Sequence, residues 1–280
     1  RHNETFMKNV TRWEVIAPRS ARYEDFPKGL DEKLVKALGK KGIRQLYRHQ
    51  RMAYNFIAEG RDIVVVTPTA SGKTLCYNLP VLDTLMKDSN ARALYLFPTK
   101  ALSQDQVSEL LELSEGAGAC IKAFTYDGDT PTSARAAIRK DGHIVVTNPD
   151  MLHTGILPHH TKWMKLFSNL KYVVLDEVHI YRGVFGSHVA NVIRRLRRIC
   201  KFYGSDPVFI CCSATISNPK ELSSKLTGKT IELIDENGAP TGEKHMIFYN
   251  PPVVNRMLGI RQSSLLTAKN LAGDLLGNGI

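Results

Sequence analysis

Long uninterrupted apolar segments are missing from this 280-residue chain, and cysteines are few. No stretch approaches the roughly eighteen consecutive apolar residues that a membrane-spanning helix needs. Residues 1–8 lack the apolar run of a signal peptide. The five cysteines form no Cys-x-x-Cys pair, which argues against a zinc site or a disulfide framework. We therefore expect a cytoplasmic protein with reduced cysteines and no membrane segment.

The charge of the chain is positive and unevenly distributed, with a net value of +11. Clustered lysine and arginine bind phosphates with little sequence preference, so we expect a polyanionic partner such as nucleic acid. The densest cluster consists of Arg194, Arg195, Arg197, Arg198 and Lys201. Apolar residues recur at helical spacing through residues 188–202, which leaves these cations on the remaining surface. They either contact DNA phosphates or form a solvated face, and the sequence leaves both interpretations open.

Short apolar segments alternate with longer helical patterns along most of the chain. The strand candidates are continuous apolar runs, as expected for strands buried on both faces. They cover residues 62–67, 93–97, 121–126, 143–147, 172–175, 208–213 and 230–234. Helical patterns cover residues 72–86, 102–113 and 187–202. This alternation predicts an α/β fold, with a mostly parallel sheet, helices on both faces, and ligands at the carboxyl ends of the strands.

Residues 67–74, Thr-Pro-Thr-Ala-Ser-Gly-Lys-Thr, lie between a predicted strand and a predicted helix. In that context loop amides and the helix N-terminus converge on phosphates. Lys73 would reach the terminal phosphates, and the Thr74 hydroxyl would hold Mg²⁺. A second Gly-Lys-Thr, residues 228–230, precedes a strand, so we do not expect it to bind phosphate. The expected phosphate ligands are Thr69, Ala70, Ser71, Gly72, Lys73 and Thr74.

A second acidic site follows the apolar strand that ends at residue 175. Asp176 would hold Mg²⁺ opposite Thr74, and Glu177 would orient and deprotonate the attacking water. An acidic pair at a strand end is common on protein surfaces, but its combination with a phosphate loop in one parallel sheet favours catalysis. Small-molecule P-loop kinases fit poorly, because several strands separate Lys73 from Asp176.

These segments resemble the motifs of superfamily 2 DExH-box helicases, in the first RecA-like motor domain, and they occur in the expected order. They are Gln50, residues 67–74 (motif I), 97–102 (Ia), 147–150 (Ib), 176–179 (II) and 213–215 (III). The resemblance implies ATP and Mg²⁺ as cofactors, with Asp176, Glu177 and Lys73 catalytic and Gln50 reading adenine. For Gln50, a surface glutamine at a helix start stays an open alternative, and Tyr47 and Arg44 are its candidate partners. By the same resemblance, His179, Ser213 and Thr215 couple nucleotide state to DNA grip, and Lys100, Thr147 and Asp150 lie in segments that face nucleic acid.

Residues 126–131 and 181–188 narrow the resemblance to the bacterial mitomycin repair factor helicases (MrfA/YprA-like), related to Lhr-type helicases. That resemblance implies a 3′-to-5′ ATP-dependent DNA translocase in repair, with DNA favoured over RNA. Two alternatives remain. One is a translocase that moves on duplex DNA without separating strands, and the other is a non-catalytic nucleic-acid-binding module with a vestigial P-loop.

Turn-rich breaks at residues 235–241 and 250–252 suggest where the organisation of the chain changes. We predict an N-terminal extension (1–45), a RecA-like ATP-binding domain (46–250), and a linker with the truncated start of a second motor domain (251–280), including a helix over 263–276. No segment resembles the family's arginine-rich motif VI. We therefore expect this fragment to bind ATP and to hydrolyse it very slowly, since an absent arginine finger costs roughly 10³–10⁵ in rate.

Overall fold

The computed structural model describes the backbone of residues 4–277 and 279, and the side chains of residues 6–99, 104–277 and 279. These residues divide into two compact units. One consists of residues 21–239, and the other combines residues 1–20 with residues 240–280. Among the described residues, no helix is both long and apolar enough to cross a membrane.

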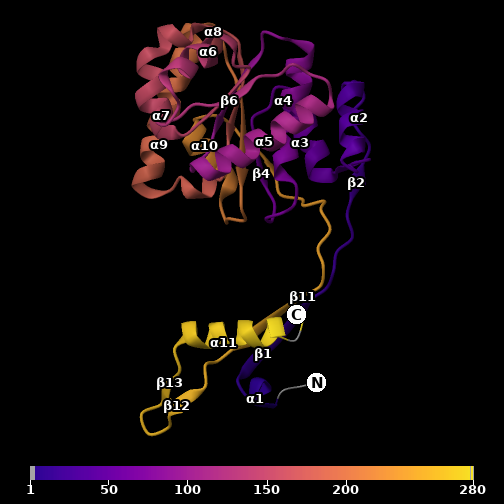
Figure 1. Ribbon diagram of the computed structural model, residues 1–280, viewed down its shortest axis with the longest axis vertical. Coiled ribbons are helices and arrows are strands. Elements are labelled where there is room, and N and C mark those ends of the chain that lie inside the picture. The colour runs from indigo at the N-terminus through magenta and orange to yellow at the C-terminus, as the bar shows by residue number, and fades with distance from the viewer. Residues whose placement is uncertain (1–3, 278, 280) are drawn as a thin grey trace. The chain divides into compact units, whose positions relative to one another are not determined.

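Unit 21–239 is built on a seven-stranded sheet in the order β10-β4-β9-β8-β5-β7-β6, in which every pairing is parallel (Figure 1). The strands are β4 (Ile63–Val66), β5 (Arg92–Leu96), β6 (Ala123–Thr125), β7 (Ile144–Thr147), β8 (Leu170–Leu175), β9 (Val208–Ser213) and β10 (Glu232–Ile234). Each coincides, within three residues at either end, with a strand that the apolar runs predicted. The α/β fold with a mostly parallel sheet is therefore confirmed.

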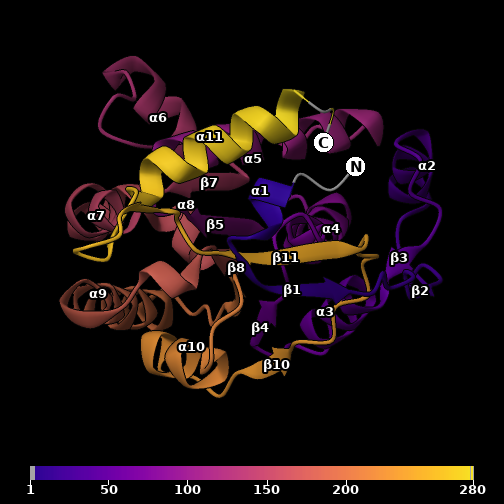
Figure 2. The same cartoon turned by 90° about the horizontal axis from the view of Figure 1, so that it is seen from below.

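Helices cover both faces of this sheet because its central strands bury side chains on both sides. In β4, Val65 belongs to one apolar core and Val64 and Val66 to the other. The first core is closed by α2 (Glu32–Lys40), α3 (Arg48–Ala58), α4 (Lys73–Lys87) and α5 (Lys100–Gly116). The second is closed by α6 (Thr132–Asp141), α8 (Met164–Ser168), α9 (Gly183–Phe202) and α10 (Pro219–Thr227). In Figure 2, α9 and α10 lie on one side of the strands, and α3 and α4 on the other.

Short helical segments connect these elements. They are α7 (Pro149–Met151), η1 (Leu152–Ile156), η2 (Leu157–Trp163) and η3 (Val178–Ile180). The two-residue strands β2 (Tyr23–Glu24) and β3 (Leu46–Tyr47) form an antiparallel pair, and α3 begins directly after β3.

The boundaries of the units differ from the predicted boundaries at residues 46 and 250. Residues 21–45 belong to the larger unit, because α2 buries Leu34 and Leu38 in the first core. Residues 240–250 belong to the smaller unit, because β11 (Lys244–Tyr249) forms an antiparallel pair with β1 (Val10–Ile16). The smaller unit also contains α1 (Glu4–Met7), the pair β12 (Val253–Asn255) and β13 (Ile260–Arg261), and α11 (Ser264–Gly277), which coincides with the helix expected over 263–276.

Candidate active site

The carboxyl ends of three neighbouring strands bring the predicted site segments together. Val66, the last residue of β4, pairs with Ser213 at the end of β9, and β9 pairs in turn with β8, which ends at Leu175. Strands β4, β9 and β8 are parallel neighbours, so the loops that follow them leave the sheet at the same edge. Residues 67–74, 176–179 and 213–215 therefore converge at one edge, as their motifs require.

The predicted phosphate loop lies between β4 and α4 and has two residues with left-handed backbones. Ala70 and Gly72 both have positive φ angles, of 60° and 75°, and Gly72 caps the N-terminus of α4. The Lys73 ammonium donates to the carbonyl oxygens of Thr67 at 2.8 Å and Pro68 at 3.2 Å. The hydroxyls of Thr67 and Ser71 lie 2.6 Å apart and close the loop from inside. Thr67, where the general pattern has glycine, is thus a structural part of the loop.

Gln50 is buried on α3 and is not a surface glutamine. Its Nε2 donates to the Gly72 carbonyl at 2.9 Å, and its Oε1 accepts from the Tyr47 backbone N–H at 2.9 Å. A Cβ on Gly72 would lie 2.7 Å from Gln50 Nε2, so a larger residue there would have to displace the end of the Gln50 side chain. Gln50 therefore joins α3 to the phosphate loop.

His49, which sequence reasoning missed, holds the phosphate loop from the other side. Its ring is fully buried, with Nε2 3.1 Å from the Ser71 carbonyl and Nδ1 3.1 Å from the Gly238 backbone nitrogen. The Gly238 N–H can only donate, so Nδ1 accepts and Nε2 carries the proton that reaches Ser71. Burial, and secondarily the Lys73 charge, lowers the pKa of His49 to about 4, against the opposing effect of the Ser71 bond. The neutral ring is thus fixed in one tautomer.

Asp176 is connected to the phosphate-loop helix through Tyr77, a second residue that sequence reasoning missed. The Tyr77 hydroxyl lies 3.2 Å from Asp176 Oδ2 and 2.8 Å from Gln106 Oε1, so one buried group contacts α4, α5 and the end of β8. Asp176 Oδ1 accepts from the Glu177 backbone N–H at 2.8 Å. Burial raises the pKa of Asp176 to about 6.

Glu177 has an oxygen without a hydrogen bond. Its Oε2 lies 3.1 Å from His179 Nδ1, and the same ring nitrogen lies 3.4 Å from the Ala214 backbone nitrogen. Within the described chain, the buried side-chain atoms that lack a partner are Glu177 Oε2, Tyr181 Oη, Ser213 Oγ and Ser223 Oγ. Three of these four belong to or follow motifs II and III. Buried polar atoms without partners are rare outside sites that receive water or ligand.

His179 joins motif II to motif III through the Ala214 contact, while Thr215 is exposed at the start of the next loop. The residues expected to face nucleic acid are less uniform. Asp150 is exposed at the first turn of α7. Thr147 is buried, and its hydroxyl donates to the Tyr126 carbonyl at 2.6 Å, so this side chain supports the edge and is not presented on it. The side chain of Lys100 lies outside the described residues.

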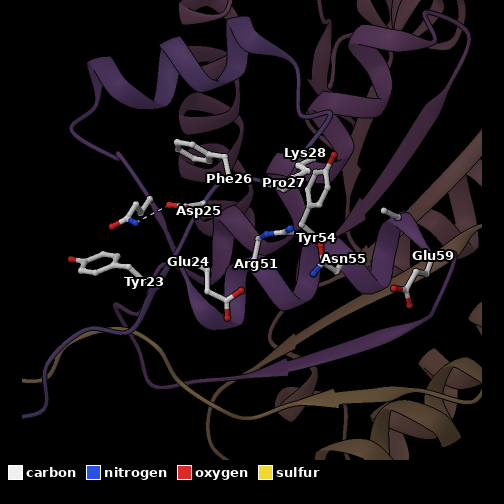
Figure 3. Close-up of a pocket in the computed structure, with 12 residues that line it drawn as sticks. Tyr23, Glu24, Asp25, Phe26, Pro27, Lys28, Arg51, Tyr54, Asn55 and Glu59 are labelled. Carbon is white, nitrogen blue, oxygen red and sulfur yellow. Dashed lines mark hydrogen bonds between the residues drawn. The ribbon is translucent and has the colours of Figure 1, made fainter.

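A hollow of about 760 Å³ lies between β2 and α3 (Figure 3). Tyr23, Phe26, Arg51 and Tyr54 are among its lining residues, none of which belongs to motifs I, II or III. The Tyr23 ring stacks on Tyr47 at 5.4 Å, and Tyr47 stacks in turn on His49. Tyr47, a candidate partner of Gln50, thus has both of its stacking contacts within the protein.

A parallel sheet with a phosphate loop and an acidic pair at its carboxyl edge defines a RecA-like nucleotide-binding motor domain. The sequence profile of the DEAD/DEAH box helicases matches residues 47–222, and the chain belongs to this family. It is 62% identical to the uncharacterized ATP-dependent helicase YprA of Bacillus subtilis, over 97% of this chain and 36% of that protein. It is 37% identical to the ATP-dependent helicase HRQ1 of Saccharomyces cerevisiae, over 99% of this chain and 26% of that protein.

Solved structures agree with this assignment and with the predicted resemblance to the MrfA/YprA-like helicases. The DUF1998 helicase MrfA bound to DNA superposes with a TM-score of 0.95 at 58% identity, covering all of this chain and 38% of that one. MrfA bound to DNA and AMPPNP gives a TM-score of 0.93, over 99% of this chain and 40% of that one. The present chain thus spans well under half the length of these relatives.

Proposed function

We propose that this chain is the ATP-binding and nucleic-acid-contacting half of an ATP-dependent DNA helicase or translocase. One observation carries the proposal. Asp176, directly after β8, is joined through Tyr77 to α4, whose first turn carries Lys73 and Thr74, and Glu177 is the next residue along the chain. Nucleotide phosphates held at that turn would therefore lie beside both carboxylates.

Each group has a defined part in this chemistry. Lys73 exchanges its carbonyl partners for the terminal phosphates, and residues 69–72 surround them with backbone N–H groups. The Thr74 hydroxyl and the Asp176 carboxylate are hard oxygen donors that suit Mg²⁺. When bound, Mg²⁺ would neutralise the charge that develops on the phosphate oxygens. Glu177 holds the attacking water with its unpaired Oε2 and accepts its proton.

The two hydrogen bonds of the Gln50 amide use one hydrogen of Nε2 and one lone pair of Oε1. The second hydrogen and the second lone pair would then bind adenine. His179, Ser213 and Thr215 would transmit nucleotide state to the nucleic-acid-contacting loops, because His179 already joins motif II to motif III. Lys100, Thr147 and Asp150 lie in segments that would face the nucleic-acid backbone, and the Thr147 hydroxyl fixes its own segment by donating to the Tyr126 carbonyl.

The finer parts of the proposal rest on the relatives. MrfA is described bound to DNA, which supports DNA over RNA as the partner. Translocation from 3′ to 5′ and a role in DNA repair follow from the resemblance to the mitomycin repair factor helicases. We further propose that residues 251–280 lead into a second motor domain, which would supply an arginine finger and close on ATP.

The test is ATP hydrolysis by the 280-residue chain, with and without single-stranded DNA, beside Lys73→Ala. We expect ATP binding that the variant loses, with turnover close to background. Robust DNA-stimulated turnover would overturn the half-motor proposal. Absence of ATP binding would instead favour a nucleic-acid-binding module with a vestigial P-loop.

The second test uses a protein that joins this chain to the second motor domain proposed above. Glu177→Gln should bind ATP and fail to hydrolyse it, whereas normal turnover would remove Glu177 from the base role. Strand displacement on duplexes with a 3′ or a 5′ tail then reports polarity. Translocation without displacement on either substrate would identify a duplex translocase.

A further inference from the structure

The arginines of α9 differ in what they contact, although their spacing along the helix looks uniform. Arg197 Nη1 donates to the carbonyl oxygens of Thr227 and Gly228, at 3.2 and 2.9 Å, and so closes the C-terminus of α10. Arg194 Nη1 donates at 2.8 Å to Asn191, one turn back along its own helix. These two cations therefore have structural partners.

Arg195, Arg198 and Lys201 have no hydrogen-bonding or ion-pair partner within the described part of the chain. They lie at spacings of three residues on consecutive turns, where like charges repel each other. A protein gains nothing in stability from such an arrangement. A polyanion that supplies phosphates along the helix would turn the repulsion into attraction and release condensed counterions.

Three surface hollows lie along the same helix. The first, of about 530 Å³, is lined by Arg195 and Arg198. The second, of about 640 Å³, is lined by Arg194, Arg197, Arg198 and Lys201, with the Asp206 carboxylate. The third, of about 520 Å³, is lined by Arg194 and Tyr181. Neighbouring hollows share a lining residue, Arg198 for the first and second and Arg194 for the second and third. We name the surface that these three hollows cover the α9 groove.

The ends of the α9 groove meet the proposed motor site. Its first hollow is also lined by Asp150, the last residue of motif Ib, and by His153, and α7 lies beside α9 in both overall views (Figures 1 and 2). Its third hollow reaches Tyr181, whose buried hydroxyl lacks a partner and lies four positions after Glu177. The first hollow thus reaches the end of motif Ib, and the third reaches the residues that precede α9.

Exposed aromatic side chains accompany the cations. Phe185 is 42% exposed and lines the first hollow, while Phe202, next to Lys201, is 76% exposed. Aromatic rings beside a basic groove give unpaired bases a stacking surface, and bases inside a duplex cannot use it. This combination favours a single strand over a double helix.

We propose that the α9 groove binds single-stranded DNA, extending the path that begins at motif Ib. The inference rests on the proposed function, since it takes nucleic acid as the partner. It adds Arg195, Arg198 and Lys201 as phosphate contacts, and Phe185 and Phe202 as stacking surfaces. Arg197 takes no part, because the end of α10 already occupies its guanidinium.

The test measures fluorescence anisotropy of a labelled oligodeoxythymidine of about 20 nucleotides, without ATP, between about 50 and 200 mM salt. The triple variant Arg195→Ala/Arg198→Ala/Lys201→Ala should bind at least about tenfold more weakly, and the slope of log affinity against log salt should fall by about 2. A matched control, Lys33→Ala/Lys36→Ala/Lys40→Ala, removes three exposed cations from one face of α2. This control should retain the affinity and slope of the unmodified chain.

If both triple variants lose the same affinity for the oligonucleotide, the effect comes from net charge alone. If the α9 variant keeps its affinity, the cations of α9 form only a solvated face. Either result overturns the proposal. Phe185→Ala/Phe202→Ala should weaken binding with an unchanged salt slope, and unchanged binding would remove the stacking part. ATP binding, measured separately, should survive in all these variants. Its loss in the unmodified chain would contradict the proposed function while leaving the DNA result readable.

Discussion

The same tripeptide, Gly-Lys-Thr, occurs twice in this chain, in two different structural contexts. At residues 72–74 it follows β4 and opens α4, whereas at residues 228–230 it ends α10 and precedes β10. Both glycines have left-handed backbones, with φ angles of 75° and 68°. Local conformation at the glycine therefore does not distinguish the two copies.

The lysines differ in their surroundings. Lys73 is held by two backbone carbonyls, partners that a phosphate can replace. Lys229 lies 3.6 Å from the Asp62 carboxylate and 2.9 Å from that of Asp206, donates to the Pro207 carbonyl at 3.0 Å, and sits over the Phe209 ring. The two copies thus differ in context: the first stands between a strand and a helix with its lysine held by replaceable partners, whereas the second precedes a strand with its lysine beside two carboxylates.

Exchanging each lysine for alanine gives the largest expected contrast. Lys73→Ala should weaken Mg²⁺-ATP binding by roughly 10- to 100-fold, because a charge-assisted hydrogen bond to phosphate is lost. Lys229→Ala should leave the dissociation constant within about twofold of the original, since none of its partners belongs to the ATP site. Titration calorimetry measures both variants. Comparable losses of affinity would remove the distinction between the copies.

Lys229→Ala should lower the stability of the chain more than Lys73→Ala, the opposite of the order expected for ATP affinity. Lys229 and Asp62 have mostly buried side chains, 14% and 13% exposed, so removing the ammonium leaves a carboxylate without its main counter-charge. We expect Lys229→Ala to lower the free energy of unfolding by about 3 kcal/mol. Lys73→Ala should lower it by less than about 1 kcal/mol. Urea denaturation monitored by circular dichroism provides the values, and a larger loss in Lys73→Ala would contradict this account.

The two glycines sharpen the comparison further. Alanine at either position meets a left-handed backbone, which costs roughly 1–2 kcal/mol of stability. Only Gly72→Ala places a methyl group against Gln50, whereas in Gly228→Ala the neighbour is Arg197 Nη1 at 2.8 Å. ATP affinity should therefore fall in Gly72→Ala and persist in Gly228→Ala. Unchanged ATP affinity in both glycine variants would argue that Gln50 does not take part in nucleotide binding.

The smallest expected effect concerns pH. Burial raises the pKa of Asp176 to about 6, and it also raises the pKa of Asp62 beside the second copy. Below about pH 6 Asp176 becomes neutral, so Mg²⁺-dependent ATP affinity should weaken by up to about tenfold per pH unit. In Asp176→Asn the carboxyl group is gone, so any remaining pH dependence of ATP affinity comes from the nucleotide. Asp62→Asn should show the same pH dependence of ATP affinity as the unmodified chain. Identical pH profiles for Asp176→Asn and the unmodified chain would argue against a role for Asp176.

Asp176 also has a defined effect on stability. Its folded pKa lies above the ordinary value of 3.8, so between that value and about 6 the folded chain holds a proton that the unfolded chain has lost. This group therefore favours folding less as pH rises through that window. Asp176→Asn should accordingly raise the melting temperature at neutral pH by a few degrees, roughly 2–4 °C per kcal/mol. A lower melting temperature would contradict the assigned burial cost.

Strands and motif order were predictable from the sequence because both are local. The seven continuous apolar runs became the seven strands of one sheet, and each expected motif followed the strand that the pattern required. Contacts between distant residues were not predictable. His49 meets Gly238, and Tyr77 meets Asp176, through folding that no spacing reveals.

The other differences between prediction and structure also come from contacts between residues that are distant in the sequence. Strand β1 pairs with β11 across most of the chain, and both are largely exposed, so neither has a continuous buried run that marks it as a strand. Thr147 ends β7 with its side chain inside the fold, although its motif suggested a surface position. Which arginines of α9 have partners depended on where α10 ends.

The central claim is that Gly72, Lys73 and Thr74, with Asp176, form a Mg²⁺-dependent ATP site. The most direct measurement titrates ATP into the 280-residue chain in the presence of Mg²⁺ and again with the metal chelated. We predict one ATP per chain, bound at least about tenfold more tightly with Mg²⁺, and loss of that difference in Asp176→Asn. Binding that is indifferent to both the metal and Asp176 would contradict the claim.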